Sequence, residues 1–294
     1  FRVSILTPAN LSHPGLATAG ARAGATVFLD LEFCRPGDRP RIEANLRQVL
    51  EQSPAEAVVG LRLTVAQAQL APPLLEMLGA RHHVLWLAGD DVSFVRELAP
   101  SESRELYREI LEVSRLESLS AEGLEYAGLV AKGHEAGGRI GEWSAFILTQ
   151  QVLSRTGLPV HVQGGVGPHS AAACLAAGAA GVVLDDQLWL MPESPLPPSW
   201  KSTLKPLNGS ETVVLGERLR NEAVVGRIAH AGADEAVDEQ QAGFLVGLVL
   251  DRIALGRDLD DHVEVVRDVL ARRDEIEAHA VLQMPVFGRY LAKV

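Results

Sequence analysis

The chain has 294 residues, of which 47% are hydrophobic and 22% charged, so it can bury a sizeable core and is not mainly disordered. Its formal net charge is −11, and the basic residues stand singly among acidic ones, which argues against nucleic acid or an anionic membrane as a partner. No apolar run reaches the roughly 18 to 20 residues that a membrane helix needs. We therefore expect a soluble, cytoplasmic protein with small-molecule or protein partners.

Cysteine usage and the start of the chain add two expectations. Cys34 and Cys174 lie far apart, so we expect neither a disulfide framework nor a cysteine metal site, and no metal. The sequence starts with Phe1, already inside a strand-like run and without a signal segment. We expect it to come from a longer parent protein.

Apolar, β-branched runs recur along the first 190 residues, with helical signals between most of them. The eight runs cover residues 3–8, 26–33, 57–63, 83–89, 106–113, 126–133, 159–165 and 181–186. Between the second and third, Ile42, Leu46 and Val49 have helical spacing after Pro40, and Pro54 ends that helix. Such crossovers make neighbouring strands parallel. The sequence predicts a (β/α)8 TIM barrel over residues 1–190, with a doubly wound open sheet as the alternative.

The pattern changes after the eighth run. Residues 192–198 hold four prolines in seven positions, so residues 191–211 are predicted to be a connector. Residues 212–215 and 223–228 resemble a hairpin, and two amphipathic helices are expected over 236–255 and 259–281. We expect residues 212–294 to form a hairpin and helical appendage packed on the barrel.

Two glycine-rich segments follow the sixth and seventh runs, where a barrel has its active face. Residues 133–141 contain four glycines in nine positions, which lets backbone approach a flat ligand. Residues 162–170 begin an alanine-rich helix, and the amides of Gly164 to Gly167 are expected to form an anion site before Pro168. A tight turn between strand and helix is the alternative reading.

These segments carry a family resemblance. Gly-His-Glu-Ala-Gly-Gly-Arg-Ile-Gly (133–141), Pro-Val-His-Val-Gln-Gly-Gly-Val-Gly (159–167) and Ala-Ala-Gly-Ala-Ala-Gly-Val-Val-Leu-Asp (176–185) resemble the nitronate monooxygenase (2-nitropropane dioxygenase) family of FMN-dependent barrels, which includes flavin enoyl reductases. The sequences of these motifs are similar to those of the family members that are embedded in bacterial polyketide or polyunsaturated fatty acid synthases. The resemblance is strongest over residues 126–195.

The resemblance implies an FMN site at the strand ends, with the phosphate on the loop after the seventh run. The residues expected to bind the cofactor are Pro8, Lys132, Gly133, Glu135, Gly137, Gly138, Gln163, Gly164, Gly165, Gly167, Asp185 and Asp186. Lys132 is expected to stabilise negative charge on reduced flavin, and a salt bridge with Glu135 or Asp30 is its alternative role.

The catalytic residues expected from the resemblance are Arg139, His134 and Lys132. Nitronate-oxidising members carry a histidine base where this chain has Arg139, and a guanidinium is no base at neutral pH. Arg139 is instead expected to polarise a thioester carbonyl or to hold a phosphopantetheine phosphate. His134 is the nearby titratable substitute, with a plain loop histidine as the alternative.

Two features of the sequence depart from the family's pattern, and a third is a pair of acidic residues that needs a cation beside it. Asp185 and Asp186 oppose a phosphate unless they point away from it, and the first run lacks the usual Pro-Met after Thr7. On the second run, Asp30 and Glu32 are expected to point into the barrel or toward its mouth, and they need a cation such as Lys132 or Arg62.

Two functions follow as expectations. The first is an FMN-dependent oxidoreductase domain that acts on acyl or enoyl thioesters, as small molecules or on a carrier protein, beside the other domains of a megasynthase. The alternative is a flavin-free, non-catalytic barrel that serves as a docking or scaffolding module.

Overall fold

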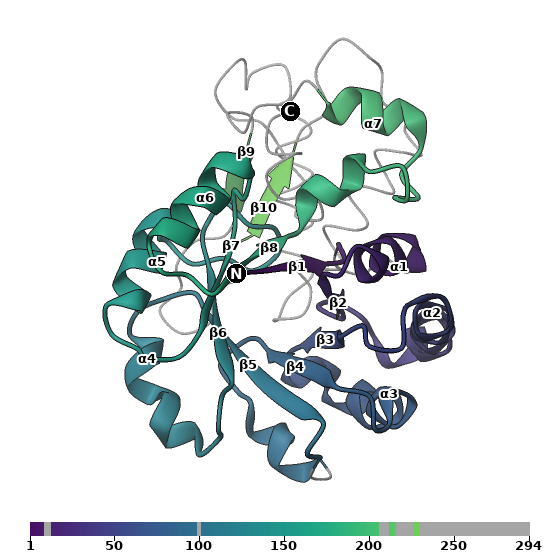
Figure 1. Ribbon diagram of the computed structural model, residues 1–294, viewed down its shortest axis with the longest axis horizontal. Coiled ribbons are helices and arrows are strands. Elements are labelled where there is room, and N and C mark those ends of the chain that lie inside the picture. The colour runs from purple at the N-terminus through teal and green to yellow at the C-terminus, as the bar shows by residue number, and fades with distance from the viewer. Residues whose placement is uncertain (9–12, 99–100, 206–211, 216–225, 230–294) are drawn as a thin grey trace, which may run out of the picture. The chain divides into compact units, whose positions relative to one another are not determined.

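The computed structural model describes residues 1–8, 13–98, 101–205, 212–215 and 226–229. Its main feature is a closed barrel of parallel strands in sequence order, with helices on the outside (Figure 1). The strands are β1 (Arg2–Leu6), β2 (Thr26–Asp30), β3 (Val59–Leu63), β4 (His83–Leu87), β5 (Arg104–Ile110), β6 (Gly128–Lys132), β7 (Val160–Gln163) and β8 (Gly181–Leu184). Because β1 pairs with both β2 and β8, the predicted TIM barrel is confirmed and the open sheet is excluded.

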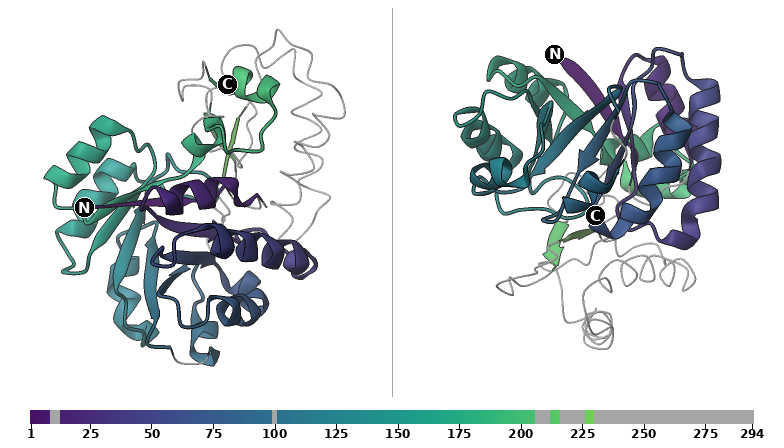
Figure 2. Two further views of the ribbon diagram at one scale, coloured as in Figure 1. Left: turned by 45° about the vertical axis from the view of Figure 1, so that its right-hand side comes forward. Right: turned by 90° about the horizontal axis from the view of Figure 1, so that it is seen from below.

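Helices and short 3-10 turns connect the strands. They are α1 (Pro14–Arg22), η1 (Pro36–Asp38), α2 (Arg39–Gln52), η2 (Val65–Leu70), α3 (Ala71–Leu78), η3 (Ser93–Glu97), α4 (Arg115–Ser118), η4 (Leu119–Glu122), α5 (Ala145–Leu153), α6 (Pro168–Ala176) and η5 (Asp186–Leu190). Figure 2 shows α1, α2 and α3 side by side outside the first strands. Helix α2 buries Ile42, Leu46 and Val49 and ends two residues before Pro54, as the sequence predicts.

Side chains alternate between the two faces of each strand, which fixes what the barrel encloses. Val27, Leu29, Leu61 and their neighbours point outward and pack against the helices. The inward cluster consists of Leu6, Phe28, Val84, Trp86, Tyr107, Val130 and Val183. Within it, the rings of Phe28 and Trp86 meet edge to face at 5.2 Å. Trp86 is therefore a core residue, as expected.

The second strand is shorter than its apolar run. β2 ends at Asp30, whereas the run extends to residue 33. Phe33 has a φ of 71°, in the left-handed region that an aromatic residue rarely adopts. The chain turns directly after the strand, where Cys34 N donates to Leu31 O at 2.9 Å, and the strained backbone of this turn lies beside the polar network described below.

The chain forms two compact units, Phe1–Ala136 with Gly141–Pro195, and Gly137–Ile140 with Leu196–Val294. In the second unit, α7 (Pro198–Leu204) lies within the segment predicted as a connector. β9 (Thr212–Leu215) and β10 (Gly226–Ala229) pair antiparallel, with the second strand starting three residues later than the predicted range of 223–228. The predicted helices over 236–255 and 259–281 lie outside the described residues. None of the described helices has the length and apolar composition to span a membrane.

Candidate functional site

Polar side chains form a layer across the barrel at the carboxyl ends of six strands. Because side chains two residues apart on a strand point the same way, these polar side chains also face the inside of the barrel, next to the apolar interior cluster and closer to the strand ends. They are Asp30 on β2, Arg62 on β3, Glu109 on β5, Lys132 on β6, Gln163 on β7 and Asp185 directly after β8, and all are buried. We call these six residues the polar layer. Active sites of this fold lie at this end of the barrel.

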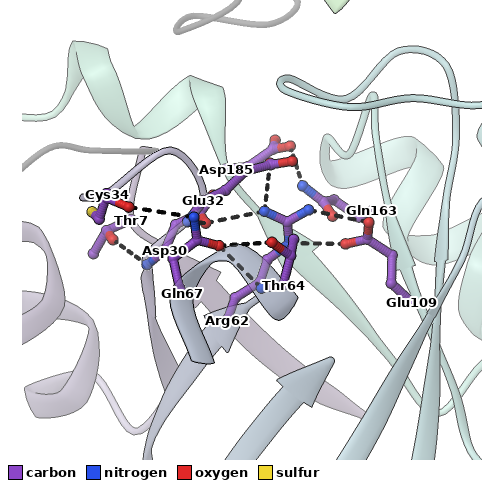
Figure 3. A network of polar contacts seen from close by, with 10 residues as sticks. All are labelled: Thr7, Asp30, Glu32, Cys34, Arg62, Thr64, Gln67, Glu109, Gln163 and Asp185. Atoms are coloured by element: carbon purple, nitrogen blue, oxygen red, sulfur yellow. Dashed lines mark hydrogen bonds and ion pairs between the residues drawn. The ribbon is translucent and has the colours of Figure 1, made fainter. Parts of the chain in front are cut away.

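Arg62 is the centre of one half of the polar layer (Figure 3). Its Nη1 donates to Asp30 Oδ1 at 3.0 Å and to Glu32 Oε2 at 2.6 Å. Its Nε and Nη2 donate to the two carboxylate oxygens of Glu109 at 2.8 and 3.1 Å. The expectation that Asp30 and Glu32 need a cation is confirmed, and the cation is Arg62. Glu109 was not predicted, although it lies two positions after the inward-facing Tyr107, just as Asp30 lies two positions after the inward-facing Phe28.

Burial and charge shift the pKa values in this network. Burial and, to a smaller extent, the charge of Glu32 raise the pKa of Asp30 to about 6, although Arg62 acts in the opposite direction. Burial alone would lower the pKa of Arg62, but the three carboxylates raise it well above its usual value. The network therefore contains one permanent cation and one carboxyl group that gains or loses a proton near neutral pH.

Lys132 lies in the other half of the polar layer. The residue is 1% exposed, and no described residue forms a hydrogen bond or an ion pair with its ammonium group. Its charge nevertheless lowers the pKa of both Asp30 and Asp185, so it lies within electrostatic range of both. Lys132 forms no salt bridge with Glu135 or Asp30, so the alternative role that the sequence predicted for it is not observed.

Gln163 and Asp185 form a buried pair next to Lys132. Lys132 and Gln163 are register partners on β6 and β7, and Gln163 Nε2 donates to Asp185 Oδ2 at 2.9 Å. Gln163 Oε1 is buried and accepts no hydrogen bond from the described part of the chain. Burial raises the pKa of Asp185, opposed by the Gln163 hydrogen bond and by Lys132. A buried acceptor without a donor is costly unless a ligand supplies one.

The loop after β7 presents backbone amides at the start of α6. Gly164 and Gly165 have φ values of 109° and 64°, which suit glycine. The amides of Gly164, Gly165 and Val166 make no hydrogen bond with any residue that the structure describes. The amide of Gly167 does not belong to this set, contrary to expectation, because it donates to Ser170 Oγ at 2.7 Å. Three open amides at a helix start are suited to an anion.

The loop after β6 is held in place by contacts between its first residues and the residues just before and at the start of α5. A Cβ at Gly133 would lie 2.2 Å from the amide nitrogen of Ala145, so only glycine fits there. Glu135 Oε2 accepts from that amide at 2.7 Å and thereby caps α5. His134 lies with its Nδ1 3.2 Å from the carbonyl oxygen of Glu142. These contacts give Gly133, His134 and Glu135 a structural role in the loop.

The remaining predicted site residues are placed as follows. Pro8 is buried two residues after the end of β1, and Asp186 is buried at the start of η5. Gly137, Gly138 and Arg139 belong to the second compact unit, where Gly138 has a φ of 73° and Arg139 is half-buried. Their expected part in ligand binding stays a prediction. No group of acidic, histidine and cysteine residues suited to a metal ion occurs among the described residues.

The fold and the polar layer together define a (β/α)8 barrel whose strand ends hold a buried lysine beside an open-amide loop. No protein-family model matches the sequence, and no curated protein matches it. Among solved structures, FabK from Thermotoga maritima is similar with a TM-score of 0.65 and 18% identity, over 97% of this chain and 86% of that one. Nitroalkane oxidase from Streptomyces ansochromogenes has a TM-score of 0.61 and 18% identity, over 98% and 91%.

A third structure comes from a biosynthetic cluster. The enoyl reductase domain of MlnA, from the macrolactin biosynthesis cluster of Bacillus amyloliquefaciens, has a TM-score of 0.56 and 11% identity, over 98% of this chain and 79% of that one. These identities establish a shared fold. The fold shared with these three structures is the barrel that the resemblance of the glycine-rich motifs implies.

Proposed function

We propose that the chain is an FMN-dependent oxidoreductase domain that acts on acyl or enoyl thioesters within a polyketide or fatty acid synthase. The observation that carries this proposal is the buried Lys132, which has no hydrogen bond or ion pair with any described residue and lies one strand from three open amides. A buried cation and a row of unused donors are costly without an anionic ligand.

The residues present fit FMN. The amides of Gly164, Gly165 and Val166 would hold its phosphate, while Lys132 and Gln163 Oε1 offer a donor and an acceptor to the polar edge of its ring. When bound, FMN supplies hydride transfer. The carboxyl group of Asp185 is directed to Gln163, and its raised pKa favours the neutral form, so it opposes the phosphate less than a free carboxylate would.

The substrate class rests on Arg139 and on the neighbours. A guanidinium binds a carbonyl or phosphate oxygen through its planar set of donors and does not remove a proton at neutral pH. Arg139 therefore suits a thioester or a phosphopantetheine arm, delivered free or on a carrier protein. The enoyl reductase domain of MlnA, itself part of a biosynthetic cluster, supports a synthase setting for this chain.

The alternative function is a flavin-free docking or scaffolding module. It is favoured by the Arg62 network, because a guanidinium and three carboxylates already satisfy one another at the ends of β2, β3 and β5. Groups that are paired in this way offer little to a flavin ring.

The test is the binding of FMN to the purified chain. Protein with an absorbance band at about 450 nm, or protein that takes up added FMN to give it, supports the oxidoreductase. Gly165→Asp should weaken FMN binding at least about tenfold, because it places a carboxylate at the open amides and strains a left-handed backbone.

Gly157→Asp is the matched control. It adds the same charge at the opposite end of β7, where a side chain meets open space, and should bind FMN as the wild type does. Colourless wild-type protein that takes up no FMN would support the docking module. Unchanged FMN binding in Gly165→Asp would show that the phosphate does not lie on these amides.

A further inference from the structure

We propose that Lys132 is a carbonyl-reactive amine, which forms a Schiff base with a small phosphorylated aldehyde or ketone whose phosphate lies on the amides of Gly164, Gly165 and Val166. This reactivity goes beyond the proposed flavin chemistry and does not depend on it. It rests on the environment of the amine, on the carboxyl groups near it and on the open amides that directly follow the neighbouring strand.

The environment of Lys132 differs from that of an ordinary lysine. The side chain is enclosed within the barrel end, yet no described residue binds its ammonium group. Arg62, the other cation of the polar layer, is by contrast bound by three carboxylates. Covalent bond formation uses the nitrogen lone pair, which an ion pair would keep protonated and engaged. Lys132 is therefore the cation of this layer that is available for chemistry, and Arg62 is the structural one.

Two carboxyl groups near Lys132 are suited to move the protons that imine formation requires. Asp30 and Asp185 are both within electrostatic range of its charge, and burial raises the pKa of each. No carboxylate oxygen of a described residue lies within 4.0 Å of Nζ, so a proton would pass through a water molecule or the substrate oxygen.

The step is balanced without an oxidant or reductant. The ammonium group loses a proton to a carboxylate, and the neutral nitrogen then forms a bond to the carbonyl carbon while an electron pair moves to the oxygen. The oxygen takes up one proton from the nitrogen and one from the carboxylic acid and leaves as water, while the second nitrogen–carbon bond forms. The products are a protonated imine, one water molecule and the carboxylate that accepted the first proton.

The position of the open amides sets the size of the ligand. Lys132 and Gln163 are register partners on adjacent strands, and Gly164 directly follows Gln163. Adjacent strands lie about 4.8 Å apart, so a phosphate on the amides and a carbonyl at Lys132 would be joined by a chain of about three or four carbons. A triose phosphate has this length.

The experiment is reductive trapping of the full chain with glyceraldehyde 3-phosphate, or with unphosphorylated glyceraldehyde, and sodium cyanoborohydride. The chain has four lysines, Lys132, Lys201, Lys205 and Lys293, so peptide mass mapping assigns each adduct. With the phosphorylated aldehyde, Lys132 should be labelled at least about tenfold more than Lys201 or Lys205. Excess inorganic phosphate, or Gly165→Asp, should remove the preference for the phosphorylated aldehyde.

Lys132→Arg keeps the charge and removes the reactive amine, and it should lose the adduct, whereas Lys201→Arg should keep it. The proposal is overturned if the label is spread evenly over the lysines, or if Lys132 stays unlabelled in wild-type protein that circular dichroism shows to be folded. Neither result requires a variant to fold.

FMN binding is measured separately on the same protein, which keeps the two proposals distinguishable. Trapping at Lys132 in protein that takes up no FMN supports this inference and contradicts the flavin function. FMN binding without any trapping supports the flavin function and contradicts this inference. Trapping that FMN suppresses supports both, because the two ligands would then share the lysine and the amides.

Discussion

Arg62 and Glu109 form a two-point ion pair across the barrel, with Nε–Oε2 and Nη2–Oε1 distances of 2.8 and 3.1 Å. They lie on β3 and β5, which are not neighbours in the sheet because β4 stands between them. The third guanidinium nitrogen, Nη1, donates to Asp30 and Glu32. The Arg62 side chain thus connects β3 to β5, with which β3 shares no backbone hydrogen bonds, and it also neutralises the acids of the neighbouring β2 and of the turn after it.

Arg62 should contribute far more to stability than any one of its carboxylate partners. Arg62→Met leaves three buried carboxylates without their cation and should lower the free energy of unfolding by about 3 to 5 kcal/mol. Asp30→Asn leaves Arg62 with Glu32 and Glu109 and removes a carboxylate that burial disfavours, so at neutral pH it should not lower the free energy of unfolding. Urea denaturation of both variants measures the difference. Equal stability of Arg62→Met and wild type would show that the network is not the buried cluster described above.

Asp30 should make the chain more stable on the acid side of neutrality. Its pKa is about 6 in the folded chain against an ordinary value of 3.8, so the folded state binds the proton more tightly. Its contribution to stability is complete below pH 3.8 and is lost as the pH rises to about 6, a change of about 3 kcal/mol. Unfolding free energies of wild type and Asp30→Asn, measured at several pH values, should diverge in this window. If the unfolding free energies of wild type and Asp30→Asn changed with pH in parallel, the raised pKa of Asp30 would be contradicted.

His161 should act in the opposite direction. Burial, with the charge of Arg2, lowers its pKa from 6.5 to about 4, and its ring stacks on Tyr107 at 5.1 Å. Its contribution to stability is present above pH 6.5 and is lost as the pH falls to about 4, a change of about 3 kcal/mol. His161→Phe keeps the stacking and should lose less stability on acidification than the wild type. A variant as acid-sensitive as the wild type would locate the acid response elsewhere.

Gly60 should tolerate no side chain, although its backbone is unstrained. A Cβ there would lie 2.5 Å from the carbonyl oxygen of Val84 and 2.7 Å from the ring of Phe28. Gly60→Ala should therefore destabilise the barrel by about 1 to 3 kcal/mol through overpacking. Gly37→Ala, where a Cβ meets no atom within 4 Å, is the control and should change stability by less than about 0.5 kcal/mol. Thermal denaturation compares the two.

Arg139 leads to a prediction about the reaction. Because a guanidinium does not act as a base at neutral pH, the wild-type chain should oxidise alkyl nitronates negligibly. Arg139→Ala should bind acyl-pantetheine more weakly, by about tenfold or more, since it loses a charged donor pair. Oxygen consumption with propyl nitronate and a binding titration with acyl-pantetheine are the measurements. Robust nitronate turnover would show that another group supplies the base, or that none is needed.

The barrel could be predicted because its signals are local. Each strand is a short apolar run, and helix α2 lies between Pro40 and Pro54 with one apolar stripe. Alternation along the second run also placed Asp30 and Glu32 inside the barrel. These features depend on neighbours within about ten residues in the chain.

The pairings within the polar layer could not be predicted in the same way. Glu109 reaches Arg62, and Gln163 reaches Asp185, only once the strands are closed in register. The loss of the Gly167 amide to Ser170 depends on a side-chain rotamer, and β2 ends early at a turn in which Cys34 N donates to Leu31 O and Phe33 is left-handed. Sequence periodicity contains no information on either.

Helix α6 has no fully buried residue, although it begins at the open-amide loop. Its core contacts come from the partly buried Ala171 and Cys174, so the hydrophobic effect contributes modestly to its attachment, and Ser170 Oγ connects its first turn to Gly165 and Gly167 of the loop. Any anion that binds the amides of Gly164, Gly165 and Val166 adds its own binding free energy to that attachment. Ligand occupancy and the local unfolding of this helix are thus linked equilibria, and amide hydrogen exchange along α6 becomes a direct gauge of how full the site is.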